Sequence, residues 1–115
     1  MPNIENIDRK ISALQSKNVS DIKVKNIPFG KLGTSYTSTD LQDIFNHQIS
    51  LLTNAKTMTD TQIRNARTSI YNSLNKAGKT EADKIINGED FSLEAYSTTD
   101  YNKLVDIVLY TFSLT

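Results

Sequence analysis

The chain has 115 residues, which include 13 Lys and Arg, 13 Asp and Glu, one His and no Cys. This length fits one domain, so we take residues 1–115 as a single domain. The zero net charge argues against a protein that coats nucleic acid or an anionic membrane by bulk charge. The lack of Cys excludes disulfide scaffolds, thiolate metal sites and thiol nucleophiles.

Targeting and membrane signals are not visible in the sequence. The N-terminal residues lack the basic stretch and apolar run of a signal peptide. No segment approaches the roughly 20 apolar residues that a membrane span needs. We therefore expect no membrane partner, and a location in the cytoplasm or, if a phage encodes the chain, in the virion.

The N-terminal segment has the pattern of a helix that docks on one neighbour. Its apolar residues are spaced by three and four positions, as in a helical seam: Ile4, Ile7, Ile11 and Leu14. We expect residues 1–18 to form an N-terminal docking helix that offers this seam as a contact surface.

Residues 19–38 lack a helical pattern. The alternation over residues 22–25 favours a short strand, and Pro28, Gly30 and Gly33 then indicate a turn-rich loop. The glycines match neither of the two common phosphate-binding motifs. We predict a loop or a short β-hairpin for residues 19–38.

Four helix starts are predicted by a repeated signal in which Thr precedes an acid. A Thr hydroxyl at the N-cap accepts a hydrogen bond from the first turn, and the acid lies at the positive end of the helix dipole. Gln42 and Gln62 add the capping-box pattern to the first two pairs. The four pairs are Thr39–Asp40, Thr59–Asp60, Thr80–Glu81 and Thr99–Asp100.

The apolar spacing that follows these pairs predicts helices over about 40–55, 60–77, 81–87 and 100–112. Gly78 is the expected residue just after the second of them. Residues 104–112 are apolar on most sides, so this segment is a central helix or, alternatively, a buried strand, because its Val, Ile, Tyr and Phe favour β-structure. The predicted fold is mainly α: a bundle of four or five helices, with residues 39–115 as the helical core.

The sequence shows no arrangement of catalytic residues. His47 is the one imidazole, so a pair of His ligands is excluded, and its position beside the apolar stripe is typical of a boundary residue. No nucleophile motif occurs. The segment 87–90, which contains Glu89 and Asp90, is best interpreted as a solvated acidic turn after a helix. We expect no enzyme, no cofactor and no metal site.

Charge is balanced overall but segregated along the chain. Residues 61–79 carry four cations and no acid: Arg64, Arg67, Lys76 and Lys79. Residues 80–115 carry seven acids against two lysines, a local charge of −5. Two faces of opposite charge would favour oriented docking or self-assembly.

Two functional hypotheses follow from these patterns. The first is a non-enzymatic interaction or assembly protein, a structural subunit or small inhibitor that binds a protein partner or a second copy of itself. The alternative is a nucleic-acid-binding regulator that uses the basic helix at 60–77, because Arg, Asn and Thr side chains contact phosphates and base edges.

Overall fold

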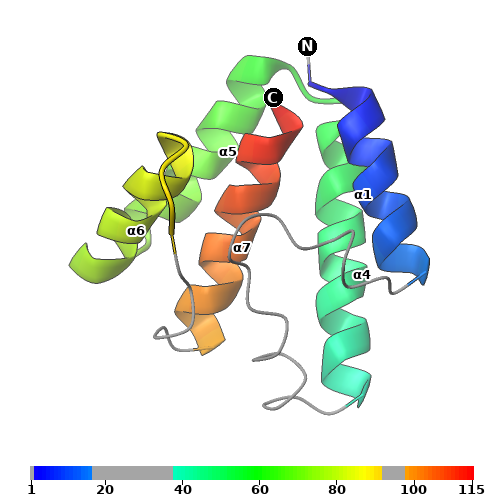
Figure 1. Ribbon diagram of the computed structural model, residues 1–115, viewed down its shortest axis with the longest axis horizontal. Coiled ribbons are helices and arrows are strands. Elements are labelled where there is room, and N and C mark those ends of the chain that lie inside the picture. The colour runs from blue at the N-terminus through cyan, green and yellow to red at the C-terminus, as the bar shows by residue number, and fades with distance from the viewer. Residues whose placement is uncertain (1, 17–37, 92–97) are drawn as a thin grey trace.

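The computed structural model describes residues 2–16, 38–91 and 98–115, apart from the side chains of residues 38–42, 44 and 98. Within these ranges the chain forms five helices and no strand (Figure 1): α1 Ile4–Ser16, α4 Ser38–Ala55, α5 Asp60–Asn72, α6 Lys76–Ile86 and α7 Thr98–Ser113. The predicted bundle of four or five helices is therefore confirmed. The loop or hairpin predicted for 19–38 lies outside the described residues, except for residue 38, where α4 begins.

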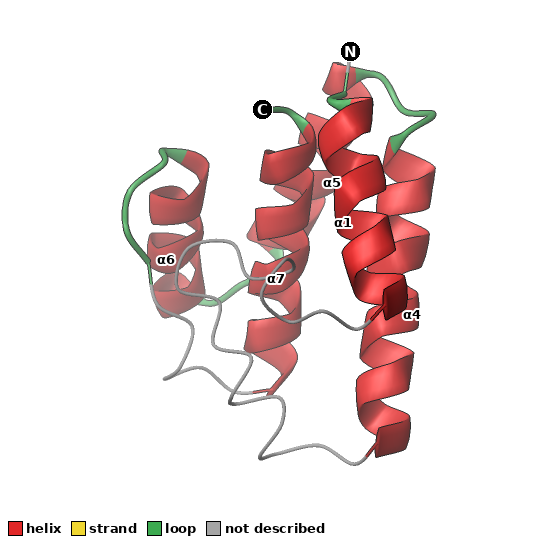
Figure 2. Cartoon of the chain, turned by 45° about the vertical axis from the view of Figure 1, so that its right-hand side comes forward, coloured by secondary structure: helices red, strands yellow, loops and turns green. Residues whose placement is uncertain are grey.

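Helix α7 is the centre of the bundle. It contacts α1, α4, α5 and α6, and it lies between the α1–α4 pair and the α5–α6 pair (Figures 1 and 2). Tyr101, Leu104, Ile107 and Leu109 are almost completely buried, although they point to different sides of the helix. Residues 104–112, for which the sequence allowed either a helix or a strand, form a central helix, because neighbouring helices cover most of its circumference.

Helix α1 packs along α4 and is fastened at its N-terminal end. The Asn3 amide donates to the Ser113 carbonyl over 2.6 Å, which ties the start of the described chain to the end of α7. Asp8 pairs with Lys56 over 2.6 Å, just beyond the end of α4. These contacts hold α1 on both α4 and α7, and the partly exposed ion pair is expected to add little to stability.

The turn between α4 and α5 confirms the predicted capping box. The Thr59 hydroxyl accepts from the Gln62 amide, and the Gln62 side chain accepts from the Thr59 amide. This exchange satisfies two backbone donors at the helix start. The helices predicted from residues 40 and 100 begin two residues earlier, at Ser38 and Thr98. Helix ends vary by this much between assignments.

The prediction of one continuous helix over residues 60–77 is wrong. Helix α5 ends at Asn72, and α6 begins at Lys76 with Asn75 as its N-cap. The Ser73 hydroxyl donates to the Ile70 carbonyl, and the Asn75 side chain accepts from the Gly78 amide over 2.8 Å. Short polar side chains of this kind compete with helical backbone bonds, so they end one helix and start the next.

This break also corrects the roles of Thr80 and Gly78. Thr80 lies inside α6, where its hydroxyl donates to the Lys76 carbonyl, so it caps no helix. Gly78 lies in the first turn of α6, where a Cβ would be 3.1 Å from the Cβ of Leu74. Gly88, with φ of 75°, follows the C-cap Asn87 and takes the left-handed conformation typical of a helix C-terminus. Glu89 and Asp90 are exposed there, as the predicted acidic turn requires.

The two capping assignments predict opposite results for two alanine substitutions. Asn75→Ala removes an N-cap acceptor and should lower the free energy of unfolding by about 1 kcal/mol. Thr80→Ala changes an exposed position within a helix and should be neutral or stabilising by up to about 0.7 kcal/mol. Urea unfolding followed by circular dichroism measures both. A larger loss for Thr80→Ala than for Asn75→Ala would contradict the break at 73–75.

Candidate functional site

The four predicted cations lie on two helices and form a continuous stripe. Arg64 and Arg67 are one turn apart on α5, and Lys76 and Lys79 are one turn apart on α6. Tyr71 connects the two pairs, because it is one turn beyond Arg67 and its ring centroid is 5.9 Å from the Lys79 ammonium. We call Arg64, Arg67, Lys76 and Lys79 the cationic stripe.

Arg67 is a partly buried cation of the stripe, as is Lys79. Its Nη1 donates to the Thr111 hydroxyl on α7 over 3.1 Å, so the side chain is oriented by the central helix. Partial burial, and then the nearby charge of Arg64, lower the pKa of Arg67 from its ordinary value. Arg67 therefore helps to attach α5 to α7, whereas Arg64 and Lys76 are exposed to solvent.

The stripe carries one carboxylate at its edge. The Tyr71 hydroxyl donates to Asp83 over 3.3 Å, and this hydrogen bond is the largest cause that raises the pKa of Tyr71. Among the described residues, none of the four cations forms a salt bridge with any carboxylate, Asp83 included. The stripe therefore presents a net positive charge to solvent.

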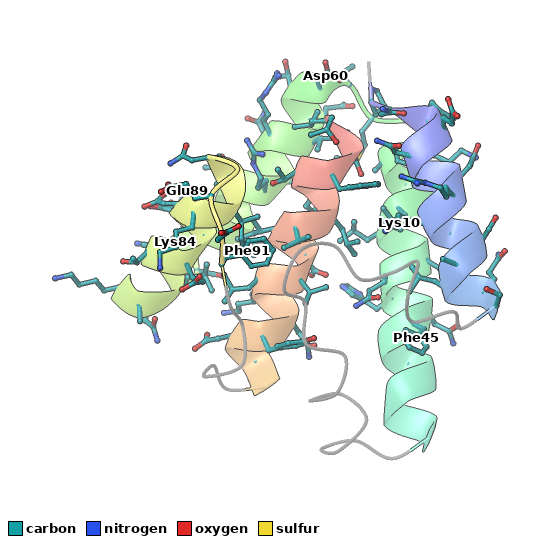
Figure 3. All side chains as sticks on the ribbon, viewed as in Figure 1. Lys10, Phe45, Asp60, Lys84, Glu89 and Phe91 are labelled. Carbon is teal, nitrogen blue, oxygen red and sulfur yellow. The ribbon has the colours of Figure 1, made fainter. Side chains whose placement is uncertain are left out.

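The expected separation into a basic and an acidic face is not what the structure shows. The boundary between the basic and acidic segments, at residues 79 and 80, falls in the middle of α6. Glu81 lies 3.7 Å from Lys84 on the same helix, and Asp106 pairs with His47. Two of the seven acids of this segment thus have a basic partner nearby, while Glu89 lies exposed beyond the C-terminal end of α6 (Figure 3).

The N-terminal seam packs inside the bundle. Ile7 and Leu14 are buried in the core, and Ile4 and Ile11 are partly buried against it. Lys10, on the same helix, is also buried, and its ammonium lies 5.0 Å from the ring centroid of Phe112 on α7 (Figure 3). The neighbour on which the seam docks is therefore the rest of the chain, and most of the seam is not available to a partner.

A second feature, which the sequence did not reveal, is a polar hollow of about 330 Å³ between α4 and α7. We call it the α4–α7 hollow; its lining residues are Asp43, His47, Gln48, Asn102 and Asp106. His47 Nε2 lies 3.1 and 3.2 Å from the two carboxylate oxygens of Asp106. His47 is thus a boundary residue, as predicted, but it has a specific partner.

The two members of this pair differ in exposure. The side chain of His47 is 61% exposed and that of Asp106 is 17% exposed. Burial raises the pKa of Asp106, and the hydrogen bond and charge of His47 oppose this rise only in part. Burial, and then the charge of Asp106, also raise the pKa of Tyr110, one turn further along α7. The one signal in the sequence was Asp106 itself, an acid that interrupts an apolar helix.

Neither feature resembles a metal centre or a membrane anchor. In the part of the chain that the structure describes, no three His, Asp or Glu side chains gather closely enough to hold a metal ion. No helix in the same residues combines the length and apolar character needed to cross a bilayer. Comparison with models of protein families, with curated proteins and with solved structures gives no match.

The raised pKa of Asp106 predicts how acid affects stability. A carboxyl with a higher pKa in the folded chain binds its proton more tightly there, so its stabilising contribution is present below about pH 3.9 and is lost as pH rises through the raised pKa. The free energy of unfolding of the wild type should therefore increase relative to Asp106→Asn as pH falls from 7 to 4. Urea unfolding at several pH values measures this difference.

His47→Gln supplies a second variant for the same experiment. Because His47 lowers the pKa of Asp106, its removal should move the pH dependence to higher pH. A wild type that loses stability relative to Asp106→Asn on acidification would show that the His47 interaction outweighs burial, and would contradict the assignment.

Proposed function

We propose that the protein is a non-enzymatic interaction protein whose cationic stripe docks on an acidic surface of a protein partner. The observation that supports this proposal is that four neighbouring cations form no salt bridge among the described residues, in a chain with equal numbers of acids and bases. Arg and Tyr are enriched at the energetic centres of protein interfaces, and the stripe contains both.

The composition of the stripe favours a protein over a nucleic acid. Proteins that make about 6–10 phosphate contacts draw a large share of their affinity for DNA from them. The stripe offers four cations, of which Arg67 is half-buried, and Asp83 at its edge would repel phosphates. A protein surface with a few carboxylates matches this small charge better than a continuous phosphate backbone does.

The proposal includes both heterologous docking and assembly of identical chains. Glu89 and Asp90 are exposed beyond α6, so a second copy of the chain also offers carboxylates to the stripe. The protein would act as a small inhibitor or an assembly subunit, in the cytoplasm or, if a phage encodes it, in the virion. Its contribution would be binding and orientation, without a chemical step.

A nucleic-acid-binding regulator is the second candidate, and the exposed side of α5 supports it. The one acid of α5, Asp60 in its first turn, is partly buried. The exposed side carries hydrogen-bonding side chains: Thr61, Gln62, Arg64, Asn65, Thr68, Ser69 and Asn72. Such side chains contact phosphates and base edges. Binding of this kind would weaken steeply as salt concentration rises.

A pair of charge reversals tests the docking proposal. Arg64→Glu combined with Lys76→Glu changes two exposed side chains, so the fold should be retained. We expect the affinity for the protein partner, or for a second copy, to fall at least about tenfold. Quantitative capture from native lysate and sedimentation at increasing protein concentration measure the two cases.

Arg9→Glu is the matched control, because Arg9 is exposed on α1, away from the stripe. It should retain the partner and the oligomeric state of the wild type. Equal capture and equal sedimentation by the stripe variant and by Arg9→Glu would contradict the proposal. A gel shift with duplex DNA that the stripe variant abolishes, without any protein partner, would favour the second candidate.

A further inference from the structure

The α4–α7 hollow contains a buried amide without a protein partner. Gln48 as a whole residue is 3% exposed and lines the hollow, and its side chain makes no hydrogen bond with any other described residue. The amide atoms of Gln48 are not among the fully enclosed, unpaired side-chain atoms of the described residues, so they remain accessible from the hollow, where a ligand can hydrogen-bond with them.

The charged groups around Gln48 indicate the sign of the charge that such a ligand would carry. Asp43 and Asp106 contribute two carboxylates to the lining, and among the described lining residues His47 is the one group that can become positive. Asp43 is exposed and makes no ion pair with the other residues that the structure describes. With neutral His47 the described lining of the hollow is negative, and it would attract a cation.

We propose that the α4–α7 hollow binds a guanidinium group, with Asp43, Gln48 and Asp106 as its acceptors. A guanidinium has five N–H donors in one plane and no acceptor. The lining is complementary, because its two carboxylates accept only and the amides of Gln48 and Asn102 each provide an accepting oxygen. An ammonium is also a donor, but as a compact charge it does not match several planar acceptors at once.

The size of the hollow limits what the guanidinium is attached to. A volume of about 330 Å³ is near the lower end of the range for small-molecule pockets, so it fits one small ligand or one side chain. The group therefore comes from a free guanidine compound or from an arginine side chain of another protein. This site is separate from the cationic stripe and does not depend on the docking proposed there.

The test is an NMR titration of the full chain with two probes, methylguanidinium and acetyl-arginine amide. We expect both to give saturable shifts of the side-chain amide signals of Gln48 and Asn102. Acetyl-citrulline amide, a neutral molecule of the same shape, should give none. Equal affinity for the two cationic probes identifies a free guanidine compound, whereas tighter binding of the arginine amide identifies a protein side chain.

Two matched substitutions localise the binding. Asp43→Asn should weaken binding of both probes at least about tenfold, because it removes a charge-assisted acceptor from an exposed position. Asp90→Asn makes the same change at an exposed carboxylate beyond α6 and should leave the Kd unchanged. The proposal fails if neither probe shifts the Gln48 signal in the millimolar range, if citrulline acts equally, or if the two variants bind alike.

Discussion

Helix α7 has apolar side chains on most of its circumference, and the fold depends on covering all of them. Its buried residues include Leu104, Val105, Ile107, Val108 and Leu109, each of which gains about 1.5–3 kcal/mol from burial if it is fully removed from water. One flat neighbour cannot cover a helix on several sides. The four other helices of the described chain therefore pack around α7, and their arrangement follows from this requirement.

The same helix also positions the polar features of the surface. Thr111 holds Arg67 in the cationic stripe, and Lys103 donates to the Ser73 carbonyl at the turn between α5 and α6. On the side toward α4, Asn102 and Asp106 line the hollow. Because these residues share the rigid helix that forms the core, both candidate surfaces are held in place by the packing of α7.

The sequence predicted those elements for which local chemistry and tertiary packing agree. Thr59 and Gln62 form the capping box that their spacing indicates, and the apolar residues at 104–109 form the central helix. The break at 73–75 was missed because Leu74 continues the apolar stripe and stays buried while the backbone leaves the helix. The capping signal at Thr80 was misleading, since Asn75 supplies the acceptor instead.

The candidate sites were harder to predict, because they depend on contacts between distant residues. His47 and Asp106 are 59 positions apart, and only the packing of α4 on α7 brings them together. The four cations were visible in the sequence, but their continuity through Tyr71 required the turn between α5 and α6. The seam of α1 was predicted as a contact surface for a partner, but its residues pack against the rest of the same chain.

Native-state hydrogen exchange tests the central role of α7 most directly. If the whole bundle depends on this helix, the amides of residues 104–109 exchange only when the protein unfolds globally, and their exchange free energy equals that from urea unfolding. The amides in the last turn of α6, which is followed by an exposed loop, should exchange through local opening at a lower free energy than global unfolding. The central role of α7 would be contradicted if its amides exchanged at a free energy well below the global value. The same holds if they exchanged at the same low free energy as the amides at the end of α6.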